Sequence, residues 1–412
     1  MTPCGYDCIV LPSRHPRSGA GPILVLDPIG RHAVAAVRGL GRAGWDVVVA
    51  GSERQADALA ARSRYAAAPY EHLPDPHGEA APFEAALAGV VRRRGCQAIV
   101  AVSDSTIARL RHLEVGVPTL PRMDAALDRV IDKLSLAAVC ADANVMYPPT
   151  WSPSLPVPAS AGWPRIVKPR QTAMARPGRV VGRTGAFVVA DPAQEDAAVA
   201  VLRAEELEPI IQVRVDRAYK VSVAIVRHRG HSSFRIAYQV LLEYPPQGGQ
   251  AAAIVSIDPH RGIGARALEV AERVCDTAGY EGLANVQLYG QEDGSICLIE
   301  VNPRVWGSTW FPERLGLRPM ERAVLAALGE DPPPPLDYPL GRRFHRPTLE
   351  ARWLLAPRGD RDAAWRLPAV MRPWDVFDLL SATDPLPFVA GLRRMVIRSR
   401  EELDPRPARR RR

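Results

Sequence analysis

Two apolar runs separated by an amphipathic stretch constrain the first part of the chain most strongly. Residues 23–27 are apolar up to Asp27, a Pro-Ile-Gly turn follows, and residues 33–41 have apolar side chains spaced for one buried helix face. The next apolar runs lie at 45–50 and 98–102. Short buried strands that alternate with a helix predict a parallel sheet with helices on its faces. No Gly-x-Gly-x-x-Gly motif follows the first strand, so NAD binding is not predicted.

The rest of the chain has a different pattern and predicts an α+β architecture. Apolar spacing predicts helices over 122–142 and 263–278. Apolar or alternating runs predict strands at 165–169, 210–215, 221–227, 234–242, 253–257, 285–289 and 296–301. The run Asp331-Pro332-Pro333-Pro334-Pro335 is typical of a boundary. We therefore expect a disordered extension over 1–21, a Rossmann-like α/β domain over 22–120, a second domain over 121–330, and a Pro/Arg/Trp-rich C-terminal extension over 331–412 with a disordered basic tail.

Composition excludes several classes of protein. A hydrophobic share of 47% with 24% charged residues is that of a soluble protein, and no apolar run is long enough for a membrane span. The first residues lack the pattern of a secretory signal, and the six cysteines are scattered without a zinc-site arrangement. These features predict a cytoplasmic protein with reduced thiols.

The formal net charge of +8 suggests anionic partners, but part of it lies in the arginine-rich tail. No basic stripe is interleaved with aromatic residues, so nucleic acid is not favoured as a partner. A phosphate-rich small substrate accounts for the internal positive charge at least as well.

Lysine is scarce in this chain. Of 53 basic residues only three are lysines, namely Lys133, Lys168 and Lys220. The abundance of arginine, alanine and proline is typical of GC-rich coding bias. In such a chain, lysine persists either by chance or where a compact ammonium is needed and a planar guanidinium would not fit.

A predicted hairpin carries the sharpest chemical signal. Side chains alternate faces along a strand, so Glu300 and Asn302 project together. If Glu292-Asp293 form a two-residue turn, Gln287 lies opposite Leu298 and diagonal to Glu300. One carboxylate and two amide oxygens on one surface suit Mg²⁺ or Mn²⁺ shared with phosphates. The alternative is the polar outer face of an exposed hairpin.

The residues around this hairpin resemble the ATP-grasp superfamily, particularly its carboxylate–amine ligase and carbamoyl-phosphate-synthetase-like branches. The resemblance is carried by Gly-Leu-Ala-Asn-Val-Gln at 282–287 and by Ile-Glu-Val-Asn-Pro-Arg at 299–304, and it extends over about 22–330. It implies a pre-ATP-grasp domain followed by a two-lobed ATP-grasp domain, with a lid subdomain over about 145–212. It further implies that Gln287, Glu300 and Asn302 hold the metal, while Arg304 neutralises phosphate or acyl phosphate.

The same resemblance assigns a nucleotide site. Lys133 and Lys168 are similar to the lysines that contact ATP phosphates, and Lys168 also supports catalysis. Gln212, Val213, Arg214 and Val215 resemble the hinge strand that binds adenine through its backbone. Lys220 stands where relatives commonly have a glutamate near the ribose.

Two departures from the family leave alternatives open at the nucleotide site. Lys220 replaces the expected acid, which bears on nucleotide affinity and on the choice of triphosphate. The loop after Lys168, over 170–179, has one glycine where relatives have several. Either arginine side chains replace the backbone amides of that loop as phosphate donors, or the loop closes poorly and catalysis is impaired.

The segment Tyr244-Pro245-Pro246-Gln247-Gly248-Gly249 resembles a Pro-x-x-Gly-Gly loop that faces the acceptor pocket in ligases of this branch. We therefore expect Tyr244, Gln247, Gly248 and Gly249 to contact substrate; the alternative is a simple turn. The family implies an ATP-dependent ligase that joins a small-molecule carboxylate to an amine through an acyl phosphate, in a possible homodimer. The competing reading is a nucleotide-binding homologue with a lost or regulatory function.

Overall fold

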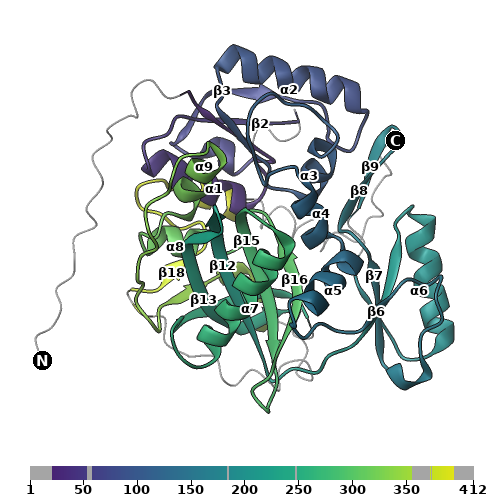
Figure 1. The fold of residues 1–412 in the computed structure, drawn as a ribbon. Coiled ribbons are helices and arrows are strands. Elements are labelled where there is room, and N and C mark those ends of the chain that lie inside the picture. Colours follow the sequence, from purple (N-terminus) through teal and green to yellow (C-terminus); the bar gives the residue numbers. More distant parts are fainter. Residues whose placement is uncertain are drawn as a thin grey trace, which may run out of the picture.

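The computed structural model describes residues 21–52, 58–182, 185–245, 248–354, 372 and 374–393. Figure 1 shows three parts: an N-terminal layered unit, a smaller lobe beside it, and a large central sheet. None of the helices in these ranges is long and apolar enough to cross a membrane.

The N-terminal unit is a parallel sheet, as the sequence predicts. Its strands, in the order β3-β2-β1-β4-β5, are β1 (Ile23–Leu26), β2 (Val47–Gly51), β3 (Ala66–His72), β4 (Ala98–Val100) and β5 (Thr119–Leu120). The helices α1 (Arg31–Arg42), α2 (Ala80–Arg94) and α3 (Asp104–Leu110) connect them. The sequence analysis missed β3, which is half-exposed along its length, and β5, which has only two residues.

The smaller lobe, called the lid, is an antiparallel sheet with one helix. Its strands, in the order β10-β7-β11-β6, are β6 (Thr150–Trp151), β7 (Arg165–Pro169), β10 (Phe187–Val189) and β11 (Pro209–Val213). Helix α6 (Pro192–Ala204) begins after Asp191, which accepts a hydrogen bond from the Gln194 N–H. The lid has its own small core around Val167, Leu202 and Ile211. A hairpin of β8 (Ala173–Arg176) and β9 (Arg179–Gly182) reaches from the lid to α3, where Ala108 packs on Ala173 and Val180.

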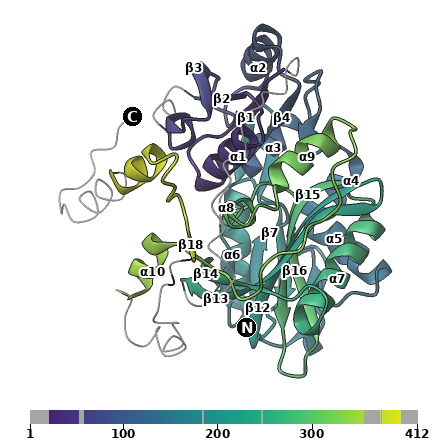
Figure 2. The same cartoon turned by 90° about the vertical axis from the view of Figure 1, so that its left-hand side faces the viewer.

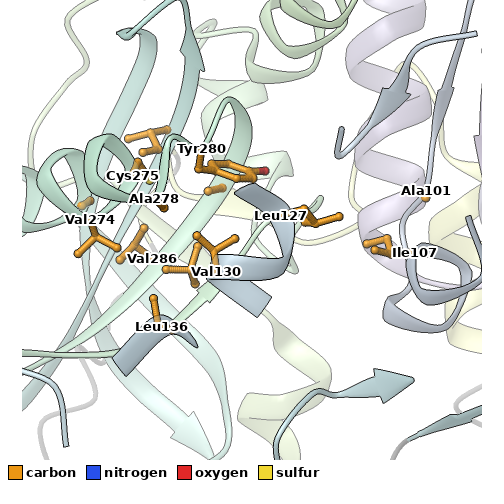
Figure 3. Close-up of a cluster of buried hydrophobic side chains, with 14 of the residues drawn as sticks. Ala101, Ile107, Leu127, Val130, Leu136, Val274, Cys275, Ala278, Tyr280 and Val286 are labelled. Atoms are coloured by element: carbon orange, nitrogen blue, oxygen red, sulfur yellow. The ribbon is translucent and has the colours of Figure 1, made fainter. Parts of the chain in front are cut away.

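The central sheet has seven strands in the order β16-β15-β12-β13-β14-β17-β18. They are β12 (Tyr219–His228), β13 (His231–Tyr244), β14 (Gln250–Ile257), β15 (Gly282–Gly290), β16 (Ile296–Asn302), β17 (Arg343–His345) and β18 (Val376–Phe377). Helix α7 (Gly262–Ala278) covers one face and ends at Gly279, whose φ of 67° is favourable for glycine. Figure 3 shows the buried cluster between this helix and the sheet, including Val274 and Val286. The opposite face of the sheet is therefore the one available for a site.

The helix predicted over 122–142 is in fact two helices, α4 (Ala125–Ile131) and α5 (Lys133–Asp142). The prediction is wrong because Asp132 has an extended backbone and accepts hydrogen bonds from the Leu134 and Ser135 N–H groups. A side chain that caps the backbone in this way starts a new helix instead of continuing the old one. Lys133 is therefore placed at the first position of α5.

The segment after the proline run continues the main fold. Helices α8 (Trp310–Arg314) and α9 (Pro319–Ala327) precede it. Strand β17 pairs with β14, and helix α10 (Pro347–Leu354) follows it. We call residues 374–393 the C-terminal strap; it contains β18 and continues past the N-terminal unit (Figure 2). Within the strap Asp384 is 1% exposed and forms an ion pair of 2.8 Å with the equally buried Arg38 of α1.

Candidate functional site

One large cavity joins all parts of the molecule. It has a volume of about 1930 Å³ and is lined by the lid, the central sheet, the first turn of α1 and the C-terminal strap. The predicted site residues that line it are Lys168, Gln212, Val213, Arg214, Val215, Lys220, Tyr244, Gly248, Gly249, Gln287, Glu300, Asn302 and Arg304. Gln247 lies outside the described residues. A single small ligand occupies roughly 300–1,000 Å³ of pocket, so this cavity has room for two.

The hairpin of β15 and β16 places the acidic residue differently from the predicted register. Gln287 pairs with Glu300, while Leu288 pairs with Leu298, so Ile299 is an extra residue on β16. The predicted pairing of Gln287 with Leu298 is wrong for two physical reasons: the connection is longer than two residues, since Gly290 pairs with Ile296, and a β-bulge adds one more shift. The result brings Gln287 directly opposite Glu300 on one face.

The charge of Glu300 is stabilised from several directions. The Asn302 Nδ2 group donates a hydrogen bond of 2.9 Å to Glu300 Oε1. Burial alone would raise the pKa of Glu300, but this hydrogen bond and the positive charges of Lys220, Lys168 and Lys133 lower it below its ordinary value. Glu300 is therefore an ionised carboxylate at neutral pH.

The three lysines of the chain act on this carboxylate electrostatically from three elements, and two of them, Lys168 and Lys220, line the cavity. Lys168 faces the cavity from β7, where alternate residues of the strand are buried in the lid. Burial and then the charge of Lys133 lower the pKa of Lys168 to about 8, although Glu300 opposes them. Lys133 donates from Nζ to the Arg170 carbonyl oxygen at 3.2 Å, and burial lowers its pKa as well.

Lys220 is held by an acid on the neighbouring strand. Its Nζ donates to Glu243 Oε1 at 3.0 Å, and Glu243 also forms an ion pair with Arg217. Lys220 therefore faces two carboxylates, Glu243 and Glu300. The negative charges of Glu243 and Glu300 therefore compensate the positive charge of Lys220 inside the cavity.

Arg304 connects the β15–β16 hairpin to the N-terminal unit. Its Nε donates to Asp104 Oδ1 at 2.7 Å, and Asp104 is the first residue of α3. Burial would lower the pKa of Arg304, but Asp104 and Glu300 raise it above its ordinary value. The guanidinium therefore stays charged at the edge of the cavity.

Two hydrogen-bond donors at the end of strand β11 are bonded to the segment before strand β6 and to its first residue. Gln212 is 2% exposed, and its Nε2 donates to Thr150 Oγ1 at 2.8 Å. The Val213 N–H donates to the Pro149 carbonyl oxygen at 3.0 Å. The stretch from Gln212 to Arg217 then continues along the cavity wall.

The arginines after Lys168 are paired with acids. Arg170 pairs with Asp132 and Glu208, and Arg176 with Glu208. Arg179 pairs with Glu206. These contacts hold the β8–β9 hairpin to its own lobe, so the arginines face carboxylates in this state rather than an open phosphate site.

The loop after β13 lies at another part of the cavity wall. Tyr244, Gly248 and Gly249 all line the cavity. A Cβ at Gly249 would lie 2.0 Å from the Tyr244 carbonyl carbon, so the close turn requires glycine there. Gln250, which follows the loop, accepts a hydrogen bond of 2.7 Å from Arg346 Nη2.

Sequence reasoning missed several charged residues of the cavity. Arg31 and His32 follow the Pro-Ile-Gly turn after β1, a position that could have drawn attention because ligands often bind beyond the carboxyl ends of parallel strands. Arg346 and Asp378 come from the C-terminal extension, where no motif marks them. Asp104 had no sequence signal either.

The residues present fit a magnesium ion shared with a nucleotide. Within the described ranges there is no group of three or more His, Cys, Asp or Glu residues arranged to hold a metal by themselves. Glu300 supplies one ionised carboxylate, and Gln287 and Asn302 supply amide oxygens on the same face. Mg²⁺ is commonly held by one or two carboxylates together with phosphates and water, so this set is sufficient only with a phosphate ligand.

Comparison with known proteins agrees with this arrangement. A family model described as the ATP-grasp domain matches residues 157–311. A comparison with curated proteins found no match.

Several solved structures share the fold at low sequence identity. The chain is similar to carboxyaminoimidazole ribonucleotide synthase from Aspergillus clavatus complexed with ATP (17% identity, TM-score 0.58, 76% of this chain and 78% of that chain covered). It is also similar to biotin carboxylase from Campylobacter jejuni in complex with β,γ-ATP (16%, 0.60, 78% and 74%). A third similar structure is L-amino acid ligase from Bacillus licheniformis (14%, 0.55, 75% and 74%).

Together the N-terminal parallel sheet, the lid and the antiparallel central sheet define the ATP-grasp fold. Residues 157–311 match the ATP-grasp domain, and the chain shares the fold of these solved structures.

Proposed function

We propose that the protein is an ATP-dependent ligase that joins a small-molecule carboxylate to an amine through an acyl phosphate. The observation that carries the proposal is the concentration of positive charge around one ionised carboxylate. Lys133, Lys168 and Lys220 all act on Glu300, and burial with uncompensated charge lowers the pKa of Lys168 to about 8. A triphosphate with a bound divalent cation would supply the missing negative charge.

The proposal gives each of these residues a role. Lys133 and Lys168 bind phosphate oxygens, and the wall from Gln212 to Val215 holds the base. Glu300, Gln287 and Asn302 hold Mg²⁺, which screens the phosphate charge when bound. Arg304, adjacent to Glu300 and fixed by Asp104, neutralises the acyl phosphate. Tyr244, Gly248 and Gly249 form part of the wall around the second substrate.

The proposed reaction has two transfers. A carboxylate oxygen of the substrate attacks the γ-phosphorus, the bond to the β–γ bridging oxygen breaks, and ADP leaves. The amine nitrogen then attacks the acyl carbon, inorganic phosphate leaves, and the nitrogen loses a proton to solvent or phosphate. The protein positions the reactants and screens negative charge, so no side-chain nucleophile is needed.

An ADP-release assay across a panel of carboxylates and amines tests the proposal. We expect ADP release that requires both a carboxylate and an amine, and that Glu300→Gln lowers by about a hundredfold or more, as loss of a charged transition-state contact does. Glu292→Gln, in the exposed turn of the same hairpin, is the matched control and should retain activity. Unchanged ADP release in Glu300→Gln would contradict the site assignment.

A second candidate function is a nucleotide-binding homologue without turnover. The pairing of Arg170, Arg176 and Arg179 with carboxylates of the protein favours it, because those arginines are then engaged and not directed at phosphate. Measurable Mg·ATP binding without ADP release from any substrate pair would support this second function over the ligase. The cytoplasmic location and the homodimer stay predictions.

A further inference from the structure

Two arginines and a histidine outside the lysine cluster also line the cavity. Arg31 and His32 belong to the first turn of α1, and Arg346 follows β17. All three line the same cavity as Glu300, and Arg304 lies near enough to affect His32 electrostatically. The carboxylates beside this group are Asp104 and Asp378.

The pKa of His32 is lowered by burial and by the arginines around it. Its pKa is lowered to about 3 by burial and then by Arg304, Arg31 and Arg346, while Asp104 opposes the shift. The imidazole is therefore neutral, and its Nδ1 is buried without a hydrogen-bond partner among the described residues. A neutral imidazole can donate one hydrogen bond and accept another.

Arg346 is a buried guanidinium with an incomplete set of partners. It is 5% exposed, and two of its nitrogens donate to the Ala251 carbonyl oxygen and to Gln250 Oε1, at 2.9 and 2.7 Å. Its Nε has no hydrogen-bond partner within the described part of the chain and lies 3.8 Å from Asp378 Oδ2. Asp378 is also the partner of Arg31, at 2.5 Å. One carboxylate thus serves two guanidinium groups, and burial and Arg31 lower the pKa of Arg346 to about 9.

The first turn of α1 adds to the positive electrostatic potential around His32 and Arg346. The helix begins after Gly30, which makes no side-chain cap. Ala33 and Val34 donate to the Gly30 carbonyl oxygen, so the N–H groups of Arg31 and His32 are the ones left without a carbonyl partner within the helix. A Cβ at Gly30 would lie 2.7 Å from His32 Nε2, so glycine leaves room for the imidazole ring to fold back over the turn. Three features therefore lie at the same wall of the cavity. They are the N-terminal end of α1, the His32 Nδ1 without a hydrogen-bond partner among the described residues, and the Arg346 guanidinium, which shares Asp378 with Arg31.

We propose that Arg31, His32 and Arg346 bind an oxyanion, either a carboxylate or a phosphate group, carried by the amine substrate. This wall is continuous with the proposed acceptor side of the cavity, because Arg346 donates a hydrogen bond to Gln250, the neighbour of Gly249. The volume of about 1930 Å³ allows a nucleotide and a second molecule to be bound together. The assignment of the oxyanion to the amine substrate rests on the proposed function, whereas the binding of an oxyanion at this wall does not.

The direct test is an NMR titration of the full-length protein without nucleotide. The imidazole resonances of His32, assigned by their loss in His32→Asn, are followed at pH 7, where the imidazole is neutral, as inorganic phosphate or, separately, acetate is added. We expect one or both anions to shift these resonances in a saturable way, and the tighter binding identifies the preferred oxyanion. Resonances of His32 that neither anion shifts overturn the proposal.

Calorimetric titration with the preferred anion locates the binding. Arg346→Met and Arg31→Met should each weaken binding about tenfold or more, since a charged hydrogen bond is lost. Arg31 is partly exposed, so its variant keeps the test valid if Arg346→Met does not fold. Arg92→Met, on the exposed face of α2, removes the same charge elsewhere and should change nothing.

The triphosphate site must be separated from this wall. Anion binding that is lost in Lys168→Met but kept in Arg31→Met and Arg346→Met places the anion at the lysines and overturns the proposal. Anion binding that depends on Arg31 and Arg346 supports it, even if the protein releases no ADP with any substrate pair. That last combination contradicts the proposed ligase function alone.

Discussion

Glu300 is the residue on which the positive charge of the cavity converges. Lys133 begins α5, Lys168 lies on β7 and Lys220 lies on β12, and all three lower the pKa of the same carboxylate. An ammonium is compact and accommodates changes of partner, whereas a guanidinium demands a planar fork of acceptors. The convergence of the only three lysines of the chain supports the hypothesis that lysine is kept where its shape matters.

The depressed pKa of Lys168 predicts a pH dependence of nucleotide binding. In the free protein Lys168 is charged below about pH 8 and loses its proton above it. A bound triphosphate favours the charged form, so affinity should be highest below pH 8 and fall as the pH rises. We expect binding of Mg·ATP to weaken about tenfold between pH 7 and pH 9, since each pH unit above the free pKa costs about 1.4 kcal/mol.

Calorimetry at the two pH values measures this effect. Lys168→Met should bind Mg·ATP more weakly than the wild-type protein at both pH 7 and pH 9. The ratio of its affinities at the two pH values should be smaller than that of the wild type. Lys133 and Glu300 remain as charged neighbours in this variant. An equal affinity of the wild-type protein at pH 7 and pH 9 would exclude a phosphate contact by Lys168.

Of the candidate site residues, those marked by a local sequence pattern could be identified from the sequence. Alternation and a family motif were enough to select Glu300, Asn302 and Arg304 as candidates. The pairing of Arg304 with Asp104 could not be predicted, because the two residues are 200 positions apart and no motif links them. The same holds for Arg346 and Asp378, which reach the cavity only through tertiary packing.

At the scale of elements, the β15–β16 hairpin shows how a small irregularity decides a site. Hydrophobic alternation predicts both strands but not the bulge at Ile299, since one extra residue leaves the overall pattern of apolar residues nearly intact. Without that bulge Gln287 would pair with Ile299, and Glu300 would lie on the opposite face of the sheet. With it they are direct cross-strand neighbours, which brings their oxygens to one surface.

Helix α8 carries a prediction about stability. Glu313 is 4% exposed, and burial raises its pKa to about 7 although the Met320 N–H donates to its carboxylate. The folded protein therefore holds this proton more tightly than the unfolded chain, whose pKa is near the ordinary 4.5. The contribution of Glu313 to stability is full below pH 4.5 and is lost as the pH rises to 7, at a cost of about 3 kcal/mol.

Glu313→Gln should therefore raise the melting temperature at pH 8 and leave it nearly unchanged at pH 4.5. The glutamine retains an oxygen that can accept the hydrogen bond from Met320 but carries no charge. Glu114→Gln, at an exposed position, is the control and should shift neither value. A melting temperature of Glu313→Gln that is no higher than wild type at pH 8 would contradict the prediction.

At the scale of the whole molecule, the N-terminal unit and the C-terminal strap are joined by a buried charge network. Asp384 accepts hydrogen bonds from Arg38 Nε, Ser63 Oγ and the Arg64 N–H, at 2.8, 2.7 and 2.9 Å. Arg38 also lies over the Trp310 ring, 4.9 Å from its centroid. These contacts join α1, the segment after it and α8 to the strap.

Removal of this carboxylate should be costly. Asp384→Ala leaves the buried Arg38 guanidinium uncompensated, and we expect a loss of about 3–5 kcal/mol in the free energy of unfolding. Urea denaturation measures it, with Asp337→Ala, at a fully exposed position, as the control. A loss below about 1 kcal/mol would show that the strap is not held by this ion pair.

The overall architecture was predictable in outline, because βαβ spacing and strand alternation are local signals. The parallel N-terminal sheet and the α+β second half follow from them and are confirmed. The strands β17 and β18 could not be predicted, since they have only three and two residues and owe their place to the pairing of β17 with β14 and of β18 with β17. The contribution of the C-terminal strap to the cavity wall depends on that placement.

The buried ion pair between Arg38 and Asp384 has a consequence for the order in which the walls of the cavity form during protein synthesis. A chain emerges from the ribosome starting with its N-terminus, and folding units form in that order. The hairpin with Glu300 is therefore available well before Asp384, and α1 carries an unpaired buried guanidinium until the strap arrives. In a nascent or prematurely terminated chain that lacks the strap, the cavity would have one wall missing.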